Sequence, residues 1–171
     1  MKGAIFYSSK YGSTAQYASW TAEATGLPVF DAIDGNEDPS NYDFLVLGSP
    51  IIYFRLSIRK WLKKHWTEIR QKPILFYSVS GSAAGKKLDN WISKSLPQEA
   101  ISKMYFVNLM GRQIPEELTL FDGTMLQIAG FFNPDREAGR QESKGFDFMD
   151  KSSIEPIVQW VHEIEAKIEV A

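Results

Sequence analysis

Short apolar runs alternate with segments of helical periodicity along this chain, and this alternation constrains the fold more than any other feature. The runs cover residues 4–7, 29–31, 44–48, 73–79 and 104–109. Continuous apolar runs of this length are typical of parallel strands that are buried on both faces. Strands joined by helices take right-handed crossovers. The sequence therefore predicts an α/β fold with a doubly wound, five-stranded parallel sheet.

Four segments between or after these runs carry apolar residues at helical spacing. The first can be capped by Ser13 or Thr14, and Gly26 ends it. The others are predicted over residues 58–69, 88–92 and 152–168, and the last of them opens with a capping-box spacing that starts at Ser152.

The stretch between Leu109 and Ser152 breaks this regular order. It holds a predicted apolar helix over residues 116–129, a polar stretch over 133–144 and a short extended piece at 146–148. A connection of about 40 residues is uncommon unless it has a function. We expect an insertion at about residues 110–145 within a single domain spanning 1–171. Its helix could cover a substrate or contact a membrane surface, and burial of that helix is the simpler alternative.

Composition narrows the function classes. The chain has no cysteine, which excludes disulfides, thiolate metal sites and cysteine nucleophiles, so redox chemistry would need a bound cofactor. A net charge of −2 gives no support for nucleic-acid binding. No apolar run approaches the roughly 20 residues that span a bilayer. The first residues show no signal-peptide pattern. We expect a cytoplasmic protein.

No side chain is predicted to be catalytic or to bind a metal. The two histidines, His65 and His162, lie in helical patterns without the context of a metal site or a catalytic triad. The carboxylates are scattered and show no spacing that indicates acid–base pairing. We predict surface or packing roles for both histidines.

The strongest functional signal is the loop after the first apolar run, Ser8-Ser9-Lys10-Tyr11-Gly12-Ser13-Thr14. Free backbone amides and the positive end of the helix dipole attract a phosphate, and the hydroxyls add donors. The loop lacks the Lys-Ser/Thr ending of a Walker loop and the GxGxxG dinucleotide pattern. It therefore favours a phosphomonoester, and the alternative is an ordinary serine-rich turn with helix capping.

This loop resembles the flavodoxin phosphate loop, whose usual form is Thr/Ser-x-Thr-Gly-x-Thr. The resemblance continues through residues 48–53 and 77–81 and covers nearly the whole chain. Residues 76–79, the insertion and residues 146–148 are most similar to the flavodoxin-domain group, which includes oxygen-independent protoporphyrinogen oxidase. The resemblance implies a sheet of order 2-1-3-4-5 that binds FMN where the strand order reverses.

The resemblance also implies FMN-binding residues in three loops. The phosphate would be held by Ser9, Lys10, Gly12, Ser13 and Thr14, with Tyr11 in a place usually taken by threonine. One face of the isoalloxazine would be flanked by Pro50, Ile51, Ile52 and Tyr53, and its other side by Ser78, Val79, Ser80 and Gly81. The alternatives are that Tyr53 or Phe54 belongs to the core and that residues 78–85 form an ordinary glycine-rich turn.

Two departures from flavodoxins bear on the partner. Residues 80–87 contain no aromatic side chain, which leaves one flavin face open to a substrate or partner unless the insertion covers it. Residues 55–72 hold seven basic side chains and a single acidic one, Glu68. A basic rim favours an anionic partner such as a carboxylate-bearing porphyrin, an acidic redox protein or lipid headgroups. A solvated helix face is the alternative.

Three functions remain open. The first is an electron carrier that serves a redox partner protein. The second is an FMN-dependent oxidoreductase of the protoporphyrinogen dehydrogenase or quinone reductase type, which the basic rim, the open face and the insertion favour. The third is a response-regulator-like domain without flavin. It would need an acidic cluster after the first strand, where this chain has Tyr7-Ser8-Ser9.

Overall fold

A parallel sheet forms the centre of the computed structural model, which describes residues 2–125 and 144–169. Its strands lie in the order β2-β1-β3-β5-β6, and the short strand β4 (Arg55–Leu56) pairs with β3. The strands are β1 (Gly3–Tyr7), β2 (Val29–Asp31), β3 (Phe44–Ile52), β5 (Ile74–Ser80) and β6 (Tyr105–Met110). The five predicted runs thus form the sheet in the order 2-1-3-4-5, and the predicted fold class is confirmed.

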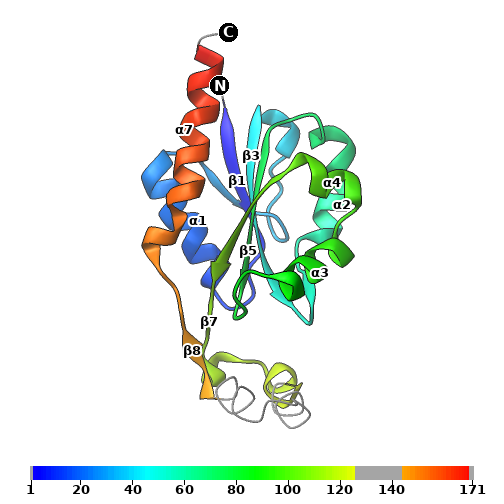
Figure 1. Cartoon of the computed structure of the whole chain (residues 1–171), viewed down its shortest axis with the longest axis vertical. Coiled ribbons are helices and arrows are strands. Elements are labelled where there is room, and N and C mark those ends of the chain that lie inside the picture. Colours follow the sequence, from blue (N-terminus) through cyan, green and yellow to red (C-terminus); the bar gives the residue numbers. More distant parts are fainter. Residues whose placement is uncertain (1, 126–143, 170–171) are drawn as a thin grey trace.

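Helices cover both faces of the sheet (Figure 1). One face carries α1 (Ser13–Thr25) and α7 (Glu155–Glu169), and the other carries α2 (Arg59–Ile69), α3 (Lys86–Ser95) and α4 (Gln98–Lys103). Successive side chains of a strand point to opposite faces of the sheet, so neighbouring residues pack against different layers of helices. Ile5 packs in the α1–α7 layer and Phe6 in the α2 layer. No helix in the described part of the chain is long and apolar enough to cross a bilayer.

The caps predicted for the first and last helices are wrong. Gly12 precedes α1 with a φ of 85°, a left-handed conformation that glycine adopts readily, and no side chain caps this helix. Asp150 rather than Ser152 opens the last helical segment, because its carboxylate accepts a hydrogen bond from the Ser152 N–H at 2.8 Å. It caps the turn η3 (Lys151–Ile154), which leads into α7. In the described part of the chain, the N-terminus of α1 therefore has no side-chain cap, whereas that of η3 is capped by Asp150.

The insertion leaves and re-enters the domain as a two-stranded ribbon (Figure 1). β7 (Arg112–Gln113) pairs antiparallel with β8 (Phe146–Asp147), at the predicted extended piece. The helix predicted from residue 116 begins later, because Pro115–Glu117 forms the turn η2 and Leu118 is extended. Residues 120–125 are helical, and Thr119 Oγ1 accepts a hydrogen bond from the Asp122 N–H at 3.2 Å. The remainder of this predicted helix and residues 133–143 lie outside the described residues.

Candidate functional site

A cavity of about 830 Å³ lies at the carboxyl ends of the central strands. It is lined by the loops that follow β1, β3 and β5, and by residues from the insertion. The strand order reverses here, since the chain goes from β1 outward to β2 and then returns to β3 on the other side of β1. Every predicted site residue lines the cavity except Gly12 and Ser78.

The loop after β1 carries hydrogen-bond donors that the fold itself leaves unused. The N–H of Gly12 donates to Ser9 Oγ at 3.2 Å, which shapes the turn into α1. The first backbone amides of any helix have no partner within the helix, and in the described part of the chain no side chain caps those of α1. Thr14 Oγ1 is buried and has no hydrogen-bond partner among residues 2–125 and 144–169. Leaving a buried hydroxyl unpaired costs about 1–3 kcal/mol, so these donors indicate a ligand rich in acceptors.

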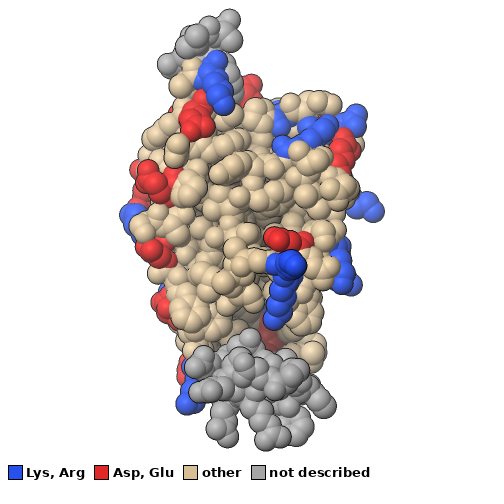
Figure 2. Space-filling model, in the orientation of Figure 1, with Lys and Arg blue, Asp and Glu red and all other residues tan. Residues whose placement is uncertain are grey.

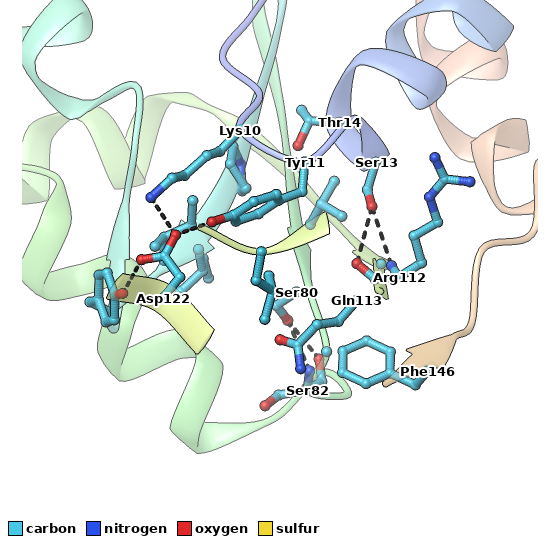
Figure 3. A pocket seen from close by; sticks show the side chains of 18 of the residues that line it. Lys10, Tyr11, Ser13, Thr14, Ser80, Ser82, Arg112, Gln113, Asp122 and Phe146 are labelled. Atoms are coloured by element: carbon cyan, nitrogen blue, oxygen red, sulfur yellow. Dashed lines mark hydrogen bonds and ion pairs between the residues drawn. The ribbon is translucent and has the colours of Figure 1, made fainter. Parts of the chain in front are cut away.

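Ser13 joins this loop to the insertion. Its Oγ donates to the carbonyl of Arg112 at 3.4 Å and accepts from the Arg112 N–H at 3.3 Å (Figure 3). The Arg112 guanidinium reaches the turn, since its Nη2 lies 3.7 Å from the position that a β-carbon on Gly12 would take. Arg112 Nε is buried, and no described residue forms a hydrogen bond with it. The sequence interpretation missed Arg112, because only the β7–β8 pairing brings it to the loop.

Asp122 of the insertion binds side chains from two of the loops. Lys10 Nζ lies 2.5 Å from its Oδ2, and the hydroxyls of Tyr11 and Tyr53 donate to its two oxygens (Figure 3). Burial acts to raise the pKa of the Asp122 carboxyl, but the hydrogen bonds from Lys10, Tyr11 and Tyr53 hold that pKa well below its usual range. Lys10, predicted at the phosphate, is thus already paired with a carboxylate. Asp122 was also missed by the sequence interpretation.

Tyr53 and Phe54 form the two-residue turn between β3 and β4. Both have left-handed backbone, with φ values of 50° and 63°, and Ile52 pairs with Arg55 across the turn. This conformation costs roughly 1–2 kcal/mol for each bulky residue. Both side chains line the cavity and are 46% and 63% exposed, which excludes the alternative that they belong to the core. Strain at exposed aromatic residues of a cavity points to a functional role.

The insertion supplies the aromatic side chains that the loop after β5 lacks. A β-carbon on Gly81 would lie 2.4 Å from Phe146 Cζ, so the Phe146 ring lies directly against this glycine. The rings of Phe146 and Phe148 stack with centroids 5.0 Å apart, and both line the cavity. The side predicted to be open is therefore bordered by aromatic residues from β8 and the residue after it.

The serines of β5 differ in their position. Ser80 Oγ donates to the carbonyl of Ser82 at 2.8 Å and accepts from its N–H at 3.2 Å, which shapes the loop beside the cavity. Ser78 lies one step deeper in the strand, and its Oγ donates to Asn108 Oδ1 at 2.7 Å. This bond within the sheet explains why Ser78 does not line the cavity.

The basic residues between positions 55 and 72 lie outside the cavity lining. In Figure 2, Lys and Arg side chains are concentrated along the edge that α2, α3 and α4 occupy in Figure 1. Some serve the fold: Arg70 Nη1 lies 3.7 Å from Glu99 Oε1, and Lys72 Nζ donates to the carbonyl of Ser40 at 2.7 Å. An anionic partner for this edge stays a prediction.

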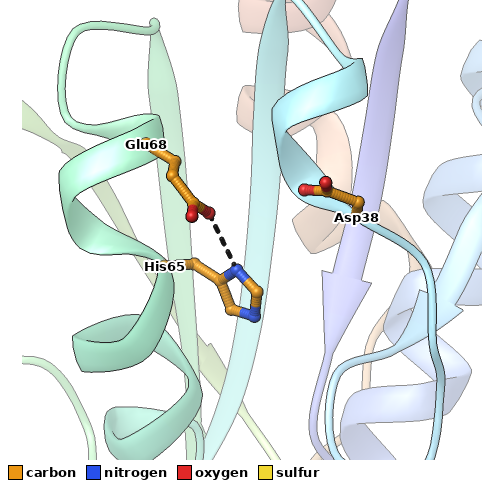
Figure 4. A group of neighbouring side chains, drawn as sticks. All are labelled: Asp38, His65 and Glu68. Atoms are coloured by element: carbon orange, nitrogen blue, oxygen red, sulfur yellow. Dashed lines mark hydrogen bonds and ion pairs between the residues drawn. The ribbon is translucent and has the colours of Figure 1, made fainter.

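A second polar group, formed by Asp38, His65 and Glu68, lies beside α2 (Figure 4). His65 Nδ1 is 3.1 Å from Glu68 Oε2, and its ring lies against Trp61 with centroids 4.9 Å apart. The Asp38 carboxylate accepts from the Ser40 N–H at 2.8 Å and so caps the turn η1 (Pro39–Asn41). Each side chain thus has a structural contact, and none of the three lines the cavity.

Residues 4–130 match the family described as the flavodoxin domain. Among curated proteins, the protoporphyrinogen IX dehydrogenase (quinone) of Escherichia coli strain K12 is 33% identical over 88 residues, which make up 47% of this chain and 49% of that protein. The chain therefore spans about half the length of the curated relatives it matches.

Solved structures show more distant likenesses. The flavodoxin, WrbA-like protein from Agrobacterium tumefaciens is 18% identical, with 82% of this chain and 98% of that chain covered, at a TM-score of 0.46. A flavoprotein from Lactobacillus acidophilus in complex with FMN is 16% identical, with 64% and 91% covered, at a TM-score of 0.46. Likenesses this distant transfer no ligand and no activity.

Proposed function

The chain belongs to the flavodoxin-domain family, and from that premise we propose that it binds FMN in the cavity and transfers electrons to or from a protein or small-molecule partner. The observation that carries the proposal is the buried, unpartnered Thr14 Oγ1 beside the uncapped N-terminus of α1. A phosphate group offers the acceptors that these donors lack, and its negative charge is stabilised at the positive end of the helix dipole.

The residues that would bind FMN form two groups, according to the part of FMN that each group would hold. The loop after β1 would bind the phosphate, and the apolar ends of β3 and β5 would flank the isoalloxazine. When bound, FMN supplies the electron or hydride transfer. The proposed binding residues for the phosphate are Ser9, Gly12, Ser13 and Thr14, in a loop whose Lys10 and Tyr11 side chains are held by Asp122. Those for the ring are Pro50, Ile51, Ile52, Tyr53, Val79, Ser80 and Gly81.

The chain's own contribution is to position the ring and to restrict its contact with water. The hydroxyl of Tyr53 is held by Asp122, which fixes a strained and exposed aromatic residue at the cavity. Phe146 lies against Gly81 across the loop after β5. Tyr53 and Phe146 both line the cavity, and aromatic side chains there suit contact with a planar aromatic ring.

The proposal is tested by titrating the purified chain with FMN and following the quenching of flavin fluorescence. We expect saturable binding of one FMN per chain. Exchange of Ser9 and Thr14 for alanine is expected to weaken this binding by about 1–3 kcal/mol, the scale of hydrogen bonds lost to a charged group. A chain that takes up no FMN contradicts the proposal, and unchanged affinity in the double variant contradicts the assigned loop.

A second candidate, an FMN-dependent oxidoreductase of the protoporphyrinogen dehydrogenase or quinone reductase type, is favoured by the insertion. Leu118, Met125 and Phe148 add apolar surface to the same cavity, which gives room for an apolar substrate beside the flavin. The relative's name, protoporphyrinogen IX dehydrogenase, agrees with such a substrate.

Anaerobic mixing separates the two candidates. Given a soluble quinone as the electron acceptor, the oxidoreductase is expected to oxidise protoporphyrinogen IX to fluorescent protoporphyrin, and the six electrons and six protons removed pass through FMN to three quinones in two-electron steps. Exchange of Met125 for Lys is then expected to slow this reaction without weakening FMN binding. Transfer to protein acceptors alone, with no reaction of either small molecule, would favour the carrier.

A further inference from the structure

The backbone that leads from β6 into the insertion is fixed against the start of α1. The Tyr17 hydroxyl donates to the carbonyl of Met110 at 2.7 Å, and the Gly111 N–H donates to the carbonyl of Ser80 at 2.9 Å. Ser13 Oγ then contacts both backbone polar groups of Arg112, at 3.3 and 3.4 Å. Arg112 is thus held beside the phosphate loop by contacts on three successive residues.

The side chain of Arg112 extends toward the turn that precedes α1. Its Nη2 lies 3.7 Å from the position of a β-carbon on Gly12, and its Nε is buried without a hydrogen-bond partner. Within residues 2–125 and 144–169, no carboxylate forms an ion pair with it. A buried donor of a charged group that stays unpaired is costly, so the geometry calls for an anion at this place.

Lys10, the other basic residue of this part of the cavity, is not available to bind such an anion. Its ammonium group is paired with Asp122 at 2.5 Å, and its pKa is raised by that hydrogen bond. The phosphate loop therefore has one cation that is neutralised by the insertion and a second, Arg112, whose Nε donor is unpaired. The planar guanidinium group matches the geometry of phosphate oxygens better than an ammonium group does.

We infer that Arg112 donates charge-assisted hydrogen bonds to the terminal phosphate of FMN and thereby sets the preference of the site for FMN over riboflavin. The inference rests on the proposed function. Arg112 begins the ribbon that carries the insertion. Phosphate binding would therefore also hold β7 and β8 against the loop after β1, so that the insertion and the cofactor stabilise each other.

The test is a pair of titrations, one with FMN and one with riboflavin, on wild type, Arg112→Gln and Arg112→Lys. Arg112→Gln is expected to bind FMN roughly 10- to 100-fold more weakly, the range for a lost hydrogen bond to a charged group. Its affinity for riboflavin, which has no phosphate, is expected to stay within about twofold of wild type. Arg112→Lys, which keeps the charge but not the fork of donors, is expected to recover part of the FMN affinity.

Arg55→Gln is the matched control, since it removes the same charge from an exposed residue of β4 that does not line the cavity. It is expected to leave both affinities unchanged. Equal loss of both flavins in Arg112→Gln, or no loss of either, overturns the inference while FMN binding by wild type upholds the proposed function. A wild-type chain that binds neither flavin overturns both.

Discussion

Phe146 occupies the space that a side chain on Gly81 would need. The Cζ atom of its ring lies 2.4 Å from the position of a β-carbon on residue 81, well inside van der Waals contact. Gly81 follows β5, and Phe146 belongs to β8 on the far side of the insertion. One wall of the cavity is therefore built by two parts of the chain that are distant in sequence.

Gly81→Ala is expected to displace the Phe146 ring and to weaken both the fold and FMN binding. Overpacking of this kind costs about 1–3 kcal/mol. Denaturant unfolding and FMN titration measure the two effects. Gly123→Ala is the matched control, because a β-carbon there meets no atom of the described residues within 4 Å. The double variant Gly81→Ala, Phe146→Ala should recover part of the lost stability. A stable Gly81→Ala chain with normal FMN affinity would contradict the close packing.

Thr14→Val is expected to change stability and binding in opposite directions. The free chain should be as stable as wild type or slightly more so, because a buried hydroxyl without a partner is replaced by a methyl group of similar size. FMN affinity should fall roughly tenfold with the loss of one hydrogen bond to the phosphate. Thr21→Val is the control for a buried threonine of the same helix whose hydroxyl already has a partner, since Thr21 Oγ1 donates to the Tyr17 carbonyl at 2.8 Å. Its stability should fall while its FMN affinity stays unchanged.

Asp122→Asn is expected to loosen the insertion from the loops after β1 and β3. The free energy of unfolding at pH 7 should fall by about 1–3 kcal/mol, because hydrogen bonds from Lys10, Tyr11 and Tyr53 to a carboxylate are weakened. The pKa of Asp122 is lower in the folded chain than in the unfolded one. Its stabilising effect is therefore present above about pH 4, the unfolded pKa, and is lost as the pH falls further.

Urea unfolding of wild type and Asp122→Asn over a series of pH values measures the contribution of the Asp122 carboxylate to the free energy of unfolding. The gap between wild type and Asp122→Asn should be largest at neutral pH and should narrow below pH 4. Asp34→Asn, a change at an exposed residue outside the cavity lining, serves as the control and should show little difference at any pH. A gap that stays constant from pH 7 to pH 2 would show that the carboxylate charge of Asp122 plays no part.

Tyr53 is expected to ionise unusually late. Partial burial and the hydrogen bond to Asp122 raise its pKa to about 12. Because the folded pKa is the higher one, the contribution of neutral Tyr53 to stability is present below about pH 10 and is lost as the pH rises toward 12. Alkaline difference spectra of wild type and Tyr53→Phe isolate its phenolate absorbance. If the phenolate absorbance that wild type has and Tyr53→Phe lacks titrates near pH 10, the contact of Tyr53 with Asp122 is contradicted.

The sheet could be predicted because each strand is short and largely apolar, as is typical of strands that pack between two layers of helices. The positions of β2 and β5 followed from such runs alone, and the loop after β1 stood out by its hydroxyl side chains. The cap of α1 was missed because a left-handed Gly12 takes the place where a serine was expected. That same feature leaves the helix amides unpaired, so the wrong prediction lies at the candidate site itself.

The contribution of the insertion could not be predicted from local patterns. Arg112, Asp122 and Phe146 reach the cavity through contacts with residues far away in the sequence, and neither periodicity nor turn composition encodes such pairs. One signal was present: Thr119 followed by Asp122 has the spacing of a helix N-terminus. It would have placed the start of the helix correctly and put Asp122 in its first turn, but not against Lys10.

The amide resonances at the start of α1 report directly on whether the phosphate of FMN binds there. In two-dimensional ¹⁵N–¹H spectra, saturation with FMN should shift the amide signals of residues 13–15 strongly, because these groups donate to the phosphate. Saturation with riboflavin should leave them close to their positions in the free chain. Equal shifts with both flavins, or no shift in residues 13–15 with FMN, would contradict the assignment of the phosphate to this helix terminus.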